Sequence, residues 1–153
     1  MNRDFVEILS ALSDEDAEYL IVGAYALAAH ALPRATGDLD IWVRASRENA
    51  SRVRRAIEIF GMPVDNISVA ELEEPGLVLQ FGFPPQRIDV MTSISGVTFA
   101  EAWPQRILVE LEGRQHPVIG RAEFIRNKRA AGRPRDLVDA EALESADRRG
   151  KEE

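Results

Sequence analysis

The sequence has no cysteine, and only two histidines occur among its 153 residues. The absence of cysteine excludes disulfide bonds, thiol catalysis and zinc sites built on thiolate ligands. A bound metal would therefore be held mainly by oxygen atoms, which favours a hard cation such as Mg²⁺ or Mn²⁺. No uninterrupted apolar run approaches the roughly 18 residues of a membrane span, and the N-terminal segment lacks the features of a secretory signal. We therefore expect a cytoplasmic protein without a membrane partner.

Basic residues are in the minority, with 19 lysines and arginines against 26 aspartates and glutamates and a net charge of -7. This balance weighs against a broad nucleic-acid-binding surface, so DNA is not an expected partner. A local basic patch remains compatible with the net negative charge. The length and the 45% hydrophobic content are typical of one globular domain. We expect a single domain over residues 1–153, with residues 145–153 frayed because they are polar.

Hydrophobic periodicity predicts an α/β fold in which a mixed sheet is flanked by helices. Glycine and proline mark several of the expected boundaries, among them a helix end before Pro33, a hairpin at Pro84 and Pro85, and a break between two C-terminal helices at Gly132. The expected helices cover residues 4–12, 24–32 and 47–60 and two segments within 121–149, and the expected strands cover 19–23, 38–43, 77–83, 87–92, 106–113 and 114–120.

Two aspartates lie inside a strand-like run. In "DLDIWV", residues 38–43, the alternation places Asp38, Asp40 and Trp42 on one face of the strand and aliphatic residues on the other. Carboxylates at i and i+2 of a strand are about 6 to 7 Å apart and can converge on one divalent cation. Asp89, in the strand-like "RIDVMT", is the candidate for a third carboxylate, which would complete a site for in-line nucleotidyl displacement. Trp42 is interpreted as a packing residue.

A glycine at a strand-to-helix junction supplies the second part of this site. Gly23 follows "YLIV" and would allow backbone N–H groups at the helix start, near Ala24, to approach a phosphate. The alternative is that Gly23 is an ordinary turn and that the two aspartates are solvated strand residues. Considered as one ordered set, the glycine turn and the aspartates favour a nucleoside triphosphate site.

The C-terminal break between helices concentrates positive charge. Lys128, Arg133 and Arg135 could neutralise a triphosphate across a cleft. The alternative is that Lys128 stabilises the end of one helix and Asp136 the start of the next.

These motifs resemble the nucleotidyltransferase superfamily to which DNA polymerase beta belongs. The resemblance rests on "GA" at 23–24, "DLD" at 38–40 and "RIDV" at 87–90. It implies that Asp38 and Asp40 bind the metal and that Asp89 binds metal and helps to activate the attacking hydroxyl. Ala24 departs from the glycine or serine usual in the family, which removes a hydroxyl contact to phosphate and leaves the backbone contacts.

A finer resemblance is to the small bacterial branch that includes the AbiEii-type toxins. It rests on "RATGDLDIWV", which contains Arg34 and Thr36, and on "FIRNKRAAGRPRDLVDAEAL". It implies that Lys128 contacts phosphate, and it matches Asp136 and Asp139 to acidic positions of unassigned role. Arg34 would reach a phosphate or pair with a nearby acid.

The sequence therefore predicts a metal-dependent nucleotidyltransferase that moves a nucleoside monophosphate from a triphosphate to an acceptor hydroxyl. The acceptor is a protein, an RNA or a small molecule, and a role in a toxin–antitoxin system with an antitoxin partner is one hypothesis. The alternative is a nucleotide-binding or partner-binding module of the same fold with weak or no catalysis. Ala24 is the residue that favours this alternative.

Overall fold

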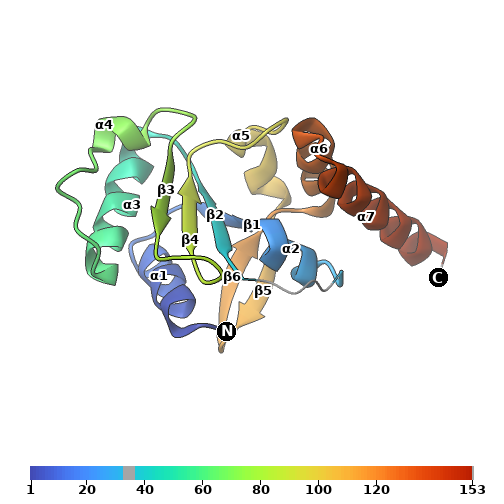
Figure 1. Cartoon of the computed structure of the whole chain (residues 1–153), viewed down its shortest axis with the longest axis horizontal. Coiled ribbons are helices and arrows are strands. Elements are labelled where there is room, and N and C mark those ends of the chain that lie inside the picture. Colours follow the sequence, from blue (N-terminus) through green and yellow to red (C-terminus); the bar gives the residue numbers. More distant parts are fainter. Residues whose placement is uncertain (33–36, 153) are drawn as a thin grey trace.

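The computed structural model describes residues 1–32 and 37–152, and a mixed sheet lies at the centre of the chain (Figure 1). The elements in chain order are α1 (Arg3–Asp14), β1 (Tyr19–Val22), α2 (Gly23–Ala29), β2 (Leu39–Val43), α3 (Arg47–Phe60), α4 (Val69–Leu72), β3 (Val78–Phe81), β4 (Ile88–Met91), α5 (Phe99–Ala102), the 3-10 helix η1 (Trp103–Gln105), β5 (Ile107–Leu111), β6 (Arg114–Val118), α6 (Arg121–Ala131) and α7 (Pro134–Glu152).

Within the described residues the sheet has six strands in the order β3-β4-β2-β1-β6-β5. The two predicted hairpins, β3–β4 and β5–β6, are both formed and antiparallel. β2 is antiparallel to β1 and parallel to β4, and β1 is parallel to β6. The strand with the two aspartates is therefore central, and the strand with the third aspartate is its neighbour.

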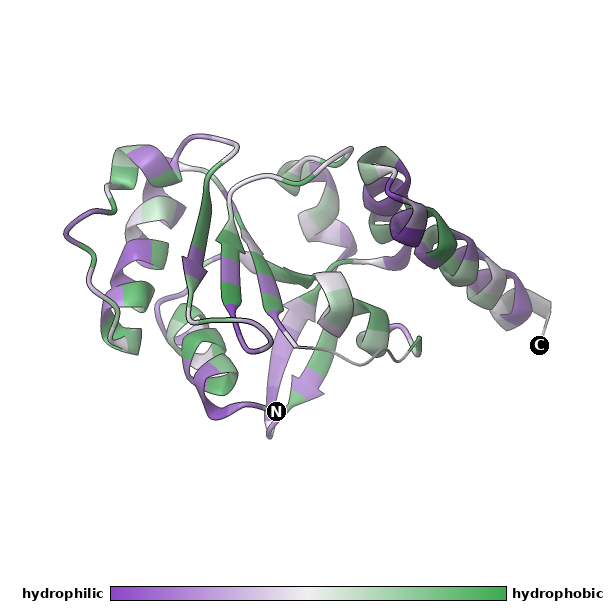
Figure 2. Cartoon of the chain, in the orientation of Figure 1, coloured by the Kyte–Doolittle hydropathy of each residue, from purple (hydrophilic) through white to green (hydrophobic). Residues whose placement is uncertain are grey.

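Helices cover both sides of this sheet. α1, α3 and α4 lie on one side, whereas α2, α5, α6 and α7 lie on the other (Figure 1). The buried side chains of α1 and α3 include Ile8, Leu12, Val53 and Ile57, which follow the helical period. Hydrophobic and hydrophilic segments alternate along both helices, as expected of helices with one buried face (Figure 2).

The predicted α/β architecture with a C-terminal helical pair is confirmed, and the differences lie at the ends of helices. α2 ends at Ala29 rather than near Pro33, because Ala31 adopts a left-handed φ of +66° and closes the helix. α7 continues to Glu152, and the fraying expected from residue 145 onward stays a prediction. Glutamate, alanine, arginine and lysine are strong helix formers, and they extend this helix although the segment is polar.

The short helix α5 is an element that periodicity does not reveal. Thr98 and Glu101 form a capping box, in which each side chain accepts a hydrogen bond from the other residue's backbone N–H. No helix in residues 1–32 or 37–152 has both the length and the apolar character of a membrane-spanning segment.

Candidate active site

The three predicted aspartates lie close together on neighbouring strands. Asp40 of β2 is the register partner of Asp89 of β4, and Asp38 lies just before the start of β2. The Arg87 backbone N–H donates to Asp38 Oδ1 at 2.8 Å, which fixes this carboxylate at the entrance of the same strand pair. The sheet register therefore gathers negative charge at one end of β2 and β4.

Gly23 provides the space that the Asp40 carboxylate occupies. A Cβ atom at Gly23 would lie 2.1 Å from Asp40 Oδ2, and the residue has a φ of +68°, which disfavours any side chain. The register of β1 and β2 produces this contact, because Val22 is the partner of Asp40. Glycine is therefore required here both by the backbone conformation and by the carboxylate beside it.

Arg87 is a component of the site that the sequence analysis misses. Its Nε and Nη2 donate to Asp89 Oδ1 and Oδ2 at 2.7 and 3.1 Å, and Nη2 also lies 3.5 Å from Asp38 Oδ2. The signal is an arginine two residues before Asp89, because residues i and i+2 of a strand share a face. A guanidinium thus bridges two of the three carboxylates.

Asp40 has the most perturbed carboxyl of this group. Burial, and after it the negative charges of Asp89 and Asp38, together raise its pKa to about 6. Arg87 opposes this shift and does not cancel it. The site consequently contains negative charge that the protein's own cations leave uncompensated.

The C-terminal helices contribute a buried ion-pair cluster. Lys128 Nζ lies 3.3 Å from Asp136 Oδ1 and 3.1 Å from Asp139 Oδ2, and all three side chains are buried. Arg133 Nε donates to Asp136 Oδ2 at 2.6 Å. Burial favours the neutral Asp136, but the hydrogen bond from Arg133 and the charge of Lys128 outweigh it and lower the Asp136 pKa. Lys128 and Asp136 therefore lie at the ends of their helices, as the alternative interpretation expects, and they also form a buried salt bridge with each other.

A cavity of about 250 Å³ separates the carboxylates from these cations. Its wall combines Asp38 and Asp40 with three basic residues of the C-terminal segment. The lining residues are Gly23, Ala24, Leu27, Gly37, Asp38, Asp40, Lys128, Arg133 and Arg135. The volume is below the 300–1,000 Å³ typical of pockets that enclose a whole small ligand, so it suits the phosphates rather than a complete nucleotide.

Some of the predicted site residues do not line this cavity. Asp89 and Asp136 lie outside its lining, each engaged by an arginine. Arg34 and Thr36 fall outside the residues that the structure describes. Among the described side chains, Arg135 lines the cavity without a hydrogen bond or an ion pair, which makes it the cation most accessible to a ligand.

The donor set fits a divalent cation in part. Asp38 and Asp40 offer hard oxygen ligands, and the raised pKa of Asp40 reflects charge that a cation would neutralise. In the described part of the chain, however, no group of three or more aspartate, glutamate or histidine side chains is arranged to hold a metal. Arg87 donates hydrogen bonds to both oxygens of the third aspartate.

Comparison with known proteins concerns the fold. No protein-family model matches the chain, and no curated protein sequence matches it. Among solved structures, the chain is similar to a provisionally assigned nucleotidyltransferase from Thermotoga maritima, with a TM-score of 0.58 and 16% sequence identity over 99% of this chain and 92% of the other. At this identity the likeness shows the fold alone, and we conclude that the chain has a nucleotidyltransferase-like fold.

Proposed function

We propose that the protein is a metal-dependent nucleotidyltransferase. The observation that carries this proposal is the cavity with Asp38 and Asp40 on one wall and Lys128, Arg133 and Arg135 on the other. Carboxylates and cations on opposite walls suit a substrate that consists of a metal ion and a polyphosphate. The similarity in fold supports the same class of reaction.

The proposed reaction is an in-line displacement at the α-phosphorus of a nucleoside triphosphate. An acceptor hydroxyl oxygen forms the new bond to phosphorus, the bond to the bridging oxygen of the β-phosphate breaks, and pyrophosphate leaves. Mg²⁺ or Mn²⁺ held by Asp38 and Asp40 would supply charge neutralisation for the phosphates. Arg135 would balance the charge of the leaving pyrophosphate, because its guanidinium lines the cavity and has no protein partner among the described residues.

Lys128 and Arg133 would position this wall as well as attract phosphate. Their ion pairs with Asp136 hold the break between α6 and α7 against the cavity. Asp89 would accept the hydroxyl proton in the proposed mechanism. Both of its oxygens bind Arg87 in the structure, so this role requires the guanidinium to release one of them.

We also propose that the protein belongs to the small bacterial branch of nucleotidyltransferases that includes the AbiEii-type toxins. Its support is that the residues of the C-terminal motif form one structural unit, in which Lys128 contacts Asp136 and Asp139. The acceptor would then be a protein, an RNA or a small molecule, and an antitoxin protein would be a partner.

One observation favours a second function, that of a nucleotide-binding module with weak or no catalysis. Arg87 Nε and Nη2 both donate hydrogen bonds to the Asp89 carboxylate. Ala24, next to the glycine of the strand-to-helix turn, has no hydroxyl that could contact a phosphate. Such a module would bind a triphosphate and release no pyrophosphate.

The test is calorimetric titration with ATP, GTP, CTP and UTP, with and without Mg²⁺. The wild type is expected to bind at least one of them in a metal-dependent manner, and the Asp38→Asn/Asp40→Asn double variant is expected to lose that binding. Arg135→Gln should weaken binding about 10-fold or more, whereas Arg148→Gln, an exposed arginine of α7, should change it less than about 2-fold. Absence of binding to folded wild type would refute the proposal, and binding without pyrophosphate release would support the second function.

A further inference from the structure

A second cavity, of about 460 Å³, lies beyond the other end of β2. It is an open cavity bordered by the start of α3, the loop after β4 and the start of α5, and Arg44, Ser46, Ile94 and Phe99 are among its lining residues. It shares no lining residue with the active-site cavity. Its volume is within the range of pockets that bind small organic molecules.

Trp42 lines this cavity, and its indole group is a reporter beside it. The residue is only 1% exposed, and its indole Nε1 is the buried side-chain nitrogen or oxygen that lacks a partner among the described residues. The Trp42 ring contacts the ring of Phe99, another lining residue, with 5.0 Å between the ring centroids, so a ligand beside Phe99 changes the surroundings of the indole.

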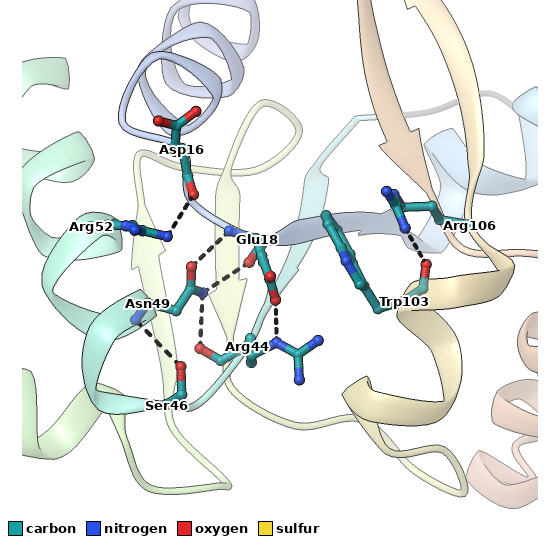
Figure 3. Close-up of polar contacts among 8 residues, drawn as sticks. All are labelled: Asp16, Glu18, Arg44, Ser46, Asn49, Arg52, Trp103 and Arg106. Atoms are coloured by element: carbon teal, nitrogen blue, oxygen red, sulfur yellow. Dashed lines mark hydrogen bonds and ion pairs between the residues drawn. The ribbon is translucent and has the colours of Figure 1, made fainter.

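Arg44 is held in place with its terminal nitrogens free. Its Nε donates to Glu18, and its guanidinium lies 4.8 Å from the centre of the Phe99 ring. The buried Asn49 fixes the backbone of this pair, because its Nδ2 donates to the carbonyls of Glu18 and Arg44, both at 3.0 Å. Figure 3 shows the two terminal nitrogens of Arg44 directed away from Glu18 and without a drawn contact. The described residues offer them no hydrogen-bond partner.

The remaining walls are formed by fixed loops. Ser93 Oγ accepts from the Gly76 N–H at 2.9 Å, and Thr92 Oγ1 accepts from the Leu77 N–H at 3.0 Å. These bonds tie the segment before β3 to the segment after β4. The capping box described above fixes the start of α5, so the cavity has its shape without a ligand.

The charge of the lining selects the class of ligand. Arg44 is the one charged residue among the described lining residues, in a chain with a net charge of -7. Glu18 occupies the Nε of Arg44, so the two terminal nitrogens are the atoms that a ligand can reach, and such a pair of N–H groups matches a carboxylate in geometry. Ile94, Val97 and Phe99 supply an apolar surface beside it. We propose that this cavity is a binding site for a small organic carboxylate, whose carboxylate group pairs with the terminal nitrogens of Arg44 and whose apolar body packs against Ile94, Val97 and Phe99.

The test uses benzoate as the probe and the indole N–H signal of Trp42 as the readout. The protein has two tryptophans, so Trp103→Phe assigns the signals in ¹⁵N correlation spectra. Titration with benzoate is expected to shift the Trp42 signal in a saturable manner, with a Kd of about 1 mM or tighter. Benzamide, which is neutral and has the same ring, should bind at least about 10-fold more weakly.

Matched arginine variants separate this site from a general effect of charge. Arg44→Gln should weaken benzoate binding about 10-fold, and Arg44→Lys, which keeps the charge and can keep the pairing with Glu18, should weaken it less. Arg47→Gln removes the same charge from an exposed position three residues away and should change binding less than about 2-fold. A Trp42 signal that does not move with benzoate, equal binding of benzamide, stronger binding of inorganic phosphate, or equal effects of the Arg44 and Arg47 variants would each overturn the proposal.

Discussion

Asp40→Asn should stabilise the metal-free protein at neutral pH. The pKa of Asp40 is raised from 3.8 to about 6 in the folded chain, mainly by burial. At about 1.4 kcal/mol per pKa unit, a shift of about 2 units corresponds to about 3 kcal/mol. Solvent screens this partly exposed carboxyl, so we expect the substitution to add about 1 to 2 kcal/mol to the free energy of unfolding.

The sign of the effect follows from which state binds the proton. Between about pH 4 and pH 6 the folded chain keeps the Asp40 proton while the unfolded chain releases it. The contribution of the Asp40 carboxyl to the free energy of unfolding of the wild type is therefore fully present below about pH 4, and it is lost as the pH rises through about 6. The Asn variant has no such loss, so its advantage over wild type should be near zero at about pH 4 and reach its full value above about pH 7.

Urea denaturation in the presence of EDTA, followed by circular dichroism at both pH values, measures this difference. Asp65→Asn, at an exposed position in the connection before α4, is the matched control and should change stability by less than about 0.5 kcal/mol. Added Mg²⁺ should reverse the ranking, because a ligand at 100 times its Kd stabilises the wild type by about 2.7 kcal/mol and the variant far less. An Asp40→Asn protein less stable than wild type at about pH 7.5 without metal would refute the reasoning.

Three further variants test the same site. Gly23→Ala should lower the free energy of unfolding by about 2 kcal/mol or more and abolish the proposed nucleotidyl transfer, because its Cβ would collide with the Asp40 carboxylate. The matched control is Gly61→Ala, because Gly61 also has a positive φ but open space around it, and this variant should cost about 1 kcal/mol by urea denaturation. Lys128→Met should cost about 3 to 5 kcal/mol in the same assay, because it removes the buried cation that pairs with Asp136 and Asp139. Arg87→Gln should tighten Mg²⁺ binding about 10-fold by calorimetry, since it frees the carboxylates that the guanidinium bridges; unchanged affinity would contradict this.

The sequence predicts those parts of the site that depend on local periodicity. Asp38 and Asp40 share a face because strand side chains alternate, and Asp89 joins them because the neighbouring strand has the same alternation. The glycine turn is also local, since its position follows directly from the end of an apolar strand. The aspartate pair and the glycine turn need no knowledge of how distant segments pack, whereas Asp89 reaches them through the pairing of β2 with β4.

The pairings among these side chains depend on tertiary geometry. Whether Arg87 turns toward Asp89 or toward solvent is a choice of rotamers within one packed sheet, and sequence spacing does not determine it. The burial of Lys128 with Asp136 and Asp139 requires the angle between α6 and α7. The free donor of Trp42 was likewise not predictable, because packing and a missing partner look identical in a sequence.

The two walls of the candidate active-site cavity come from parts of the chain that are far apart in sequence. Asp38 and Asp40 lie in the first third, on the sheet, whereas Lys128 and Arg135 lie on the closing helical pair. A protease cut or a premature stop codon after Ile119 would therefore remove all three basic residues of the cavity at once and leave the six described strands, with their carboxylates, in the chain. Loss of the last two helices would abolish the proposed activity.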